Sequence, residues 1–182
     1  MPLSRISNNQ IATDAAISAT KLGTMANANM PTGSVLQVQT TNAKASLGAS
    51  ASTSFVDIGI SCSITPSATS SKILIHRTQG FYIYGGGGDV GFNTLLLRSI
   101  GGASYSGILS GRTGPTHSGA YMNSGGSSEL ADIQGLTFLD TPSTTSAITY
   151  KIQACMIGAG GSFNMNLSDD TYANLTLLEI KG

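Results

Sequence analysis

The clearest pattern along the chain is a strict alternation of apolar and polar residues over positions 54–65. Apolar residues recur at every second position, with small or polar residues between them and Phe55 as the exception. A period of two predicts a strand with one buried face. Residues 147–157 repeat the pattern. The two predicted inward-facing sets are Val56, Ile58, Ile60, Cys62 and Ile64 in the first segment, and Ile148, Tyr150, Ile152, Ala154 and Met156 in the second.

Three further segments, residues 72–75, 94–97 and 175–180, are apolar at consecutive positions. Such runs predict central strands that are covered on both faces. Strand-like stretches at 34–40, 80–84 and 133–139 complete a set of about eight, and turn-forming residues separate them. No eleven-residue window of the body has helical periodicity. We therefore predict an all-β fold, a β-sandwich or jelly-roll-like body over residues 32–182.

Residues 1–31 differ from this body. Their apolar residues Ile6, Ile11, Ile17 and Leu22 recur at intervals of five or six, which fits neither a helix nor a strand. The segment ends at Met30-Pro31, which interrupts regular structure. We expect an extended N-terminal arm that becomes ordered against a partner. A tail without a fixed partner is the alternative, and the sequence does not separate the two.

Charge is scarce in this chain. Charged residues make up 10%, against roughly 25% in an ordinary soluble domain, and nine basic residues balance nine acidic ones. A neutral chain lacks the basic surface that nucleic-acid binding requires, and no apolar run is long enough to insert into a membrane. The hydrophobic fraction of 40% still supports a packed core. A neutral surface suits packing against copies of the same chain or a larger assembly, or alternatively a secreted β-domain.

The two cysteines lie far apart in strand-like segments. Cys62 and Cys155 are expected to be buried, reduced thiols rather than a disulfide framework. The first residues, MPLSRISNNQIATD, contain no apolar core after a basic start, so no secretory signal is predicted and synthesis in a cytoplasm is expected.

Residues 99–128 form a long stretch rich in glycine and serine. Long irregular segments within compact domains are often functional. This one carries aromatic, arginine and histidine side chains, which on an adaptable backbone suit recognition. Two weak edge strands with flexible connections are the alternative. The candidate recognition residues are Tyr105, Arg112, His117 and Tyr121.

Catalytic motifs are not found. Residues 86–91 match G-x-G-x-x-G, but the following residues predict a strand, whereas a dinucleotide site needs a helix there, so a glycine-rich hairpin is the better interpretation. His76 and His117 have no metal-ligand spacing, and His76 is expected to be half-buried within a strand. Asp169-Asp170 suits a solvated turn better than a calcium site. We predict no catalytic residue, no cofactor and no metal.

Several short pieces, in order, resemble a known module. They are GSVLQV at 33–38, FVDIGI at 55–60 leading to SITPS at 63–67, SKILI at 71–75, LLLR at 95–98, FLDTP at 138–142, SAITYKI at 146–152 and LTLLEI at 175–180. Over residues 33–182 the chain resembles the β-sandwich module of bacteriophage virion proteins, especially fibre and appendage proteins of phages that infect marine bacteria and cyanobacteria. The arm is similar to repeats at the virion-proximal ends of such fibres.

The resemblance implies a non-enzymatic virion structural protein, made in the host cytoplasm. It implies a homotrimer that attaches to other virion proteins through its arm and presents the sandwich to a host-surface glycan or protein. Typical fibres have a long shaft between anchor and tip, whereas here the arm meets the sandwich almost directly. A head-fibre or capsid decoration protein is therefore an alternative. A third hypothesis, from another class, is a carbohydrate-binding or hydrolytic β-domain.

Overall fold

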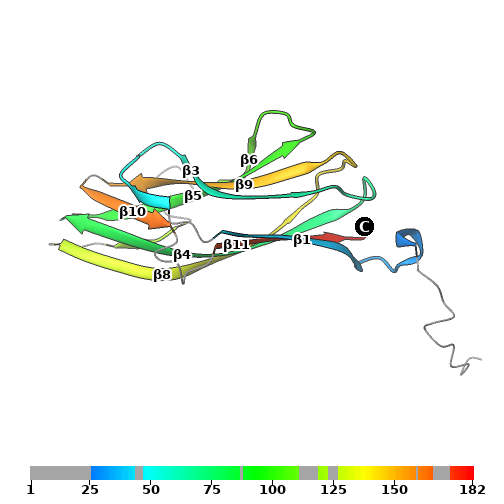
Figure 1. Cartoon of the computed structure of the whole chain (residues 1–182), viewed down its shortest axis with the longest axis horizontal. Coiled ribbons are helices and arrows are strands. Elements are labelled where there is room, and N and C mark those ends of the chain that lie inside the picture. The colour runs from blue at the N-terminus through cyan, green and yellow to red at the C-terminus, as the bar shows by residue number, and fades with distance from the viewer. Residues whose placement is uncertain are drawn as a thin grey trace, which may run out of the picture. The chain divides into compact units, whose positions relative to one another are not determined.

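A computed structural model of the chain describes residues 26–43, 47–86, 88–110, 119–122, 127–158, 160–165 and 173–182 (Figure 1). The predicted arm residues Ile6, Ile11, Ile17 and Leu22 lie outside these ranges. The chain divides into two compact units, Met1–Met30 and Pro31–Gly182. Apart from one 3₁₀ helix, η2 (Asn27–Asn29), the regular structure in the described ranges is β-strand. Two antiparallel sheets pack together, which confirms the predicted β-sandwich.

The first sheet is organised around the longest strand, β4 (Lys72–Gly86). One edge of β4 pairs along nearly its whole length with β8 (Ser127–Asp140). The other edge pairs first with β11 (Ala173–Ile180) and then with β10 (Gly161–Met165). Two outer strands complete the sheet, β1 (Val35–Ala43) beside β11 and β2 (Leu47–Ser50) beside β10.

The second sheet covers one face of the first. Its order is β3 (Val56–Ile64), β9 (Ile148–Ile157) and β5 (Val90–Ile100). The remaining edge of β5 pairs with β6 (Ser106–Ser110) near its C-terminal end and with β7 (Tyr121–Met122) near its start. Strands β6 and β8 are thus outer strands of their respective sheets among the described elements.

The core lies between the sheets, and the predicted alternation decides which side chains enter it. Ile58, Ile60, Cys62 and Ile64 of β3 are buried and Val56 is partly buried against them, while all five predicted residues of β9 are buried. The first sheet contributes its own alternating set, and burying each large apolar side chain contributes about 1.5–3 kcal/mol. These fully buried residues of the first sheet are Ile73, Ile75, Ile83, Phe163, Leu175 and Leu177.

Coverage on both faces is confirmed for one of the three consecutive apolar runs. In β5, the inward Thr94 and Leu96 and the outward Leu97 are all buried, and Leu95, also outward, is partly exposed. For residues 72–75 and 175–180 the prediction is wrong, because each alternates between a buried and a partly exposed face. Both runs belong to the first sheet, which, among the described residues, has a second layer on one side only.

The glycine-rich segment at 86–91 connects β4 to β5, and Gly88 has a φ of +97°, a conformation that favours glycine. A strand, not a helix, follows it, as predicted. The hairpin interpretation is wrong, because β4 and β5 belong to different sheets and the segment crosses from one sheet to the other. The cysteine prediction also holds, since Cys62 and Cys155 are both buried free thiols.

Candidate recognition site

A bulge in β3 shapes the outer face of the second sheet. The β3–β9 register passes from the pair Asp57–Gln153 to the pair Ser61–Lys151, so four steps along β3 match two along β9. Gly59, within the bulge, has a φ of +78°, which a residue with a Cβ rarely adopts. Bulges bend a strand and re-aim its side chains. Here the bend accompanies a depression of about 410 Å³.

An ion pair lies in this depression. The Asp57 carboxylate accepts hydrogen bonds from Lys151 Nζ at 3.0 Å and from Gln153 Nε2 at 2.8 Å. Partial burial by itself raises the pKa of Asp57, but these hydrogen bonds and the charge of Lys151 hold it below its usual range. Lys151 Nζ also lies 4.2 Å from the centre of the Tyr105 ring, a cation–π contact. The lining residues are Asp57, Gly59, Ile60, Ser61, Tyr105, Lys151 and Ile152.

The chemistry of this lining suits binding. Glycoside hydrolysis by the common mechanism needs two carboxyl groups about 5–10 Å apart, one of them protonated. The lining has a single carboxyl group, Asp57, which is ionised and paired with Lys151. An aromatic ring beside charged and hydroxyl groups is able to contact a sugar or a polar peptide. We name this surface, defined by Asp57, Tyr105 and Lys151, the Tyr105 depression.

The four predicted recognition residues do not share this surface. Tyr105 lines it, whereas Tyr121 lies on β7 opposite Gly91, near the start of β5. Tyr105 precedes Ser106, which pairs with Arg98, so the tyrosines lie at opposite ends of β5, about 23 Å apart along the strand. A hydrogen bond with Asp89 raises the pKa of Tyr121. Arg112 and His117 are outside the described residues.

Lys151 and Gln153, the partners of Asp57, are not among the site residues predicted from the sequence. Their outward position was available from the alternation in 147–157. Their contact with Asp57 depends on the β3–β9 register and its bulge, which join residues more than 90 positions apart.

No candidate metal site is found in the described segments, because nowhere in them do three His, Cys, Asp or Glu side chains lie close enough together to hold an ion. His76, expected to be half-buried, is exposed on the outer face of β4, and its Nδ1 lies 3.0 Å from Thr137 Oγ1. His76 is exposed because the even-numbered residues at this end of β4 face away from the core. Asp169 and Asp170 lie outside the described residues.

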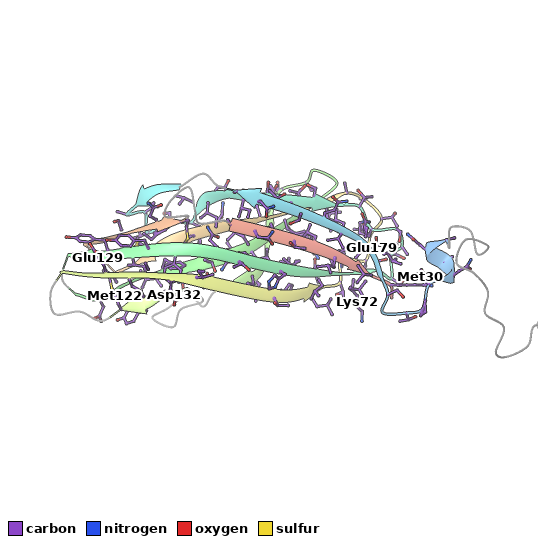
Figure 2. All side chains as sticks on the ribbon, turned by 60° about the horizontal axis from the view of Figure 1, so that its bottom comes forward. Met30, Lys72, Met122, Glu129, Asp132 and Glu179 are labelled. Carbon is purple, nitrogen blue, oxygen red and sulfur yellow. The ribbon has the colours of Figure 1, made fainter. Side chains whose placement is uncertain are left out.

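The outer face of the first sheet presents a second surface (Figure 2). The registers of β8, β4, β11 and β1 align one apolar side chain from each strand in a row across the sheet. At the two ends of the row, the exposed fractions are 48% for Leu139 and 54% for Val38. Exposed contiguous apolar groups on a soluble domain often mark an interface. We name this the apolar row: Leu139, Leu74, Leu178 and Val38.

In comparisons with known proteins, no family model and no curated sequence matches this chain. In the ranges that the structure describes, no helix has the length and apolar character needed to cross a bilayer.

Proposed function

We propose that this chain is a non-enzymatic structural protein of a bacteriophage virion, a short tail fibre or appendage. In this proposal residues 1–31 attach it to other virion proteins and the sandwich faces the host. The observation that carries it is the spatial arrangement of the pieces that resemble the phage module. Those at 33–38, 175–180, 71–75 and 138–142 contribute to four neighbouring strands, β1, β11, β4 and β8, so they contribute to one continuous surface.

The proposed protein is a homotrimer in which the outer face of the first sheet packs against another copy. The apolar row supports this, because Val38 and Leu139 otherwise expose about half of their surface to water. The charge of the chain is also compatible with packing against a second copy, since copies with a formal net charge of zero do not repel one another over long range. The outer edge of β8 pairs with no described strand, and closed oligomers commonly cover such edges.

The Tyr105 depression is the proposed contact with the host, either a surface glycan or a protein. It lies on the second sheet, on the opposite side of the sandwich from the apolar row, so both surfaces can be used at once. The polar groups of its lining, Asp57, Ser61 and Lys151, suit a hydrated partner, and Tyr105 supplies a stacking face.

A head-fibre or capsid decoration protein is the second candidate. The apolar row favours it equally, because the same exposed side chains suit a permanent contact with a capsid protein. The two candidates differ in what the Tyr105 depression does, since a decoration protein need not bind the host.

Light scattering tests the oligomer. Full-length protein should have a mass near three times 18.5 kDa, and a Val38→Asp, Leu139→Asp double variant should be a folded monomer. The control is Ser63→Asp, Ser106→Asp, which adds the same charge at exposed positions of the second sheet, away from the proposed interface, and should remain a trimer. A monodisperse wild-type monomer would contradict the trimer.

Adsorption separates the two candidates. Purified phage particles should contain the chain by mass spectrometry, and the purified protein should bind host cells and compete with infection if it is a fibre. Particle incorporation without cell binding would favour decoration. Absence from the particle would contradict both.

A further inference from the structure

An arginine lies in the core, and no carboxylate of the described residues pairs with it. Arg77 faces inward from β4 with 1% of its surface exposed. Its Nη2 donates a hydrogen bond to Oε1 of Gln134 on β8. Among the described residues, no group accepts a hydrogen bond from its Nε or Nη1. Gln79, the next inward residue of β4 and the register partner of Gln134, is also 1% exposed with neither side-chain amide atom bonded.

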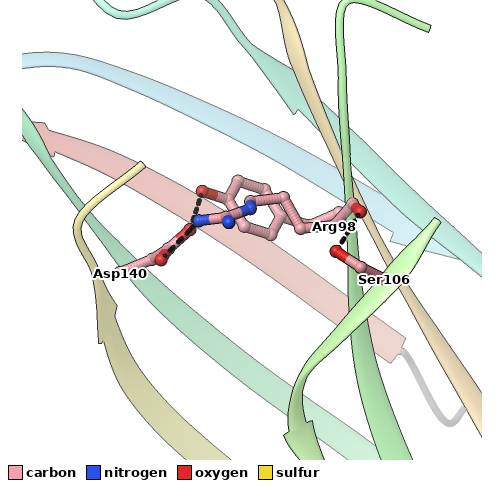
Figure 3. A network of polar contacts seen from close by, with 4 residues as sticks. Arg98, Ser106 and Asp140 are labelled. Atoms are coloured by element: carbon pink, nitrogen blue, oxygen red, sulfur yellow. Dashed lines mark hydrogen bonds and ion pairs between the residues drawn. The ribbon is translucent and has the colours of Figure 1, made fainter. Parts of the chain in front are cut away.

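The other inward-facing charged groups of the described core have partners. Arg98 reaches from the second sheet to Asp140 at 2.9 Å, and the buried hydroxyl of Tyr150 donates to the same carboxylate at 2.7 Å (Figure 3). Glu179 accepts four hydrogen bonds from uncharged donors. Both carboxylates flank Ile73, four residues along β4 from Arg77, or about 13 Å. Neither is within reach of Arg77.

Arg77 and Gln134 line a cavity of about 50 Å³ between the sheets. Holding one water requires about 10–15 Å³, so the cavity accommodates a chloride-sized ion together with one or two waters. Its lining includes residues of β8 and β6, the outer strands on one side of the sandwich, and Gly135 among them is exposed. An ion therefore has a short path from solvent. The remaining lining is Thr94, Leu96, Leu109, Leu136 and Ile152.

The electrostatics favour a negative charge at this position. Burial lowers the pKa of Arg77 to about 10, so the guanidinium is still charged at neutral pH. Water satisfies its N–H groups but does not neutralise it, and an unpaired buried charge is one of the most costly features that a core can contain.

We propose that this cavity binds one small monovalent inorganic anion, the size of chloride, which neutralises Arg77 and accepts hydrogen bonds from its unpartnered N–H groups. Gln134 and Thr94 complete the polar side of the site, and the leucines and Ile152 exclude larger anions. The site is independent of the proposed role in a virion.

Thermal unfolding tests the site directly. The full-length protein is equilibrated in sodium gluconate, whose anion is too large for the cavity, and gluconate is replaced by chloride or bromide at constant ionic strength. We expect the melting temperature to rise and saturate. For a domain of this size, an anion at a hundred times its dissociation constant raises the melting temperature by about 5–10 °C.

Two variants separate this site from general salt effects. Arg77→Met removes the charge and keeps an apolar chain of similar length, so its melting temperature should be the same in gluconate and chloride. Lys151→Met removes a cation from the Tyr105 depression and should keep the full chloride response. Equal responses of Arg77→Met and the wild type, or no response of the wild type, would overturn the proposal.

A direct measurement serves if Arg77→Met does not fold. Crystals of the wild type grown or soaked in bromide should give an anomalous peak within hydrogen-bonding distance of the Arg77 guanidinium. Water alone, or a carboxylate of the chain itself, at that position would contradict the proposal.

Discussion

Replacing Glu179 with glutamine should loosen one end of the sandwich in a pH-dependent way. Glu179 lies on β11 (Figure 2) with 0% of its surface exposed, and no cation of the described residues forms an ion pair with it. Its Oε1 accepts hydrogen bonds from the backbone and hydroxyl of Ser67 and from the hydroxyl of Ser71, at 2.6–2.7 Å. Its Oε2 accepts from Gln37 Nε2 at 2.6 Å. The carboxylate thus joins β1, β11 and the connection between β3 and β4.

The magnitude follows from these four bonds. Glu179→Gln keeps one acceptor oxygen for the three bonds from Ser67 and Ser71, but that oxygen is no longer charged. Each of these three bonds is thereby weakened by about 1 kcal/mol. The new amide meets the amide of Gln37, donor against donor, and turning Gln37 breaks its bond to the carbonyl of Thr65. A neutral amide is less costly to bury, which offsets part of this loss. The expected net loss is about 2–4 kcal/mol, or about 5–15 °C in melting temperature.

The pH dependence distinguishes the charge from simple packing. Burial raises the pKa of Glu179, but the bonds from Ser71, Gln37 and Ser67 outweigh it and hold the pKa below its usual range. A carboxyl group with a lowered folded-state pKa stabilises the fold above the unfolded-state value of about 4.3. That contribution is lost as the pH falls from there through the folded-state pKa.

Chemical denaturation of both proteins at pH 7 and at successive values below about 4.3 measures the effect. The stability gap between wild type and Glu179→Gln should be widest at pH 7 and should narrow as the pH falls. A gap that is constant with pH, or a variant as stable as the wild type at pH 7, would refute the reasoning.

Three further predictions concern the core and the Tyr105 depression. Ile58→Asp should abolish cooperative unfolding in circular dichroism, because an unpaired buried charge costs several kcal/mol against a total of about 5–15; Ser61→Asp on the outer face of the same strand should stay folded. Asp140→Asn should destabilise by about 2–3 kcal/mol in urea, below the usual range for a buried pair because the Arg98 side chain is 22% exposed; no loss would show that the pair is dispensable. Tyr105→Ala should reduce host-cell binding while changing stability by less than about 1 kcal/mol, and Tyr105→Phe should retain most binding; unchanged binding by Tyr105→Ala would place the contact elsewhere.

The apolar row and the Tyr105 depression are both formed by outward-facing residues of alternating strands, but their chemistry differs. On the first sheet the outward positions include the apolar row and, beside it, Thr40 and Thr176, whose Oγ1 atoms lie 3.0 Å apart across β1 and β11. Lys72 and His76 of β4 also face outward on this sheet. On the second sheet the outward positions include an ion pair. If the proposed function is correct, the face that carries the apolar row packs within the particle, and the face that carries the Tyr105 depression remains in contact with water and the host.

The sequence by itself determined the fold class and the inward set of β3 and β9, because parity in a strand assigns every second side chain to the same face. The same parity places Arg77 and Gln79 inward, between Ile75 and Phe81, although the polar character of that stretch hides the signal. The sequence did not determine whether the outer face of a strand is covered by another layer, since an apolar outward residue such as Leu178 has the same sequence pattern in both cases.

Only the tertiary structure decided which distant residues meet. Asp57 and Lys151 are 94 positions apart, and Arg98 and Asp140 are 42 apart and on different sheets. Their contacts depend on strand order, register and the bulge at Gly59, each of which is set by the packing of the whole sandwich. Local alternation is a property of a single strand, whereas a binding surface or a buried charge pair needs several strands in register. For that physical reason the chain's pattern predicted the layers, and the fold was needed to find the sites.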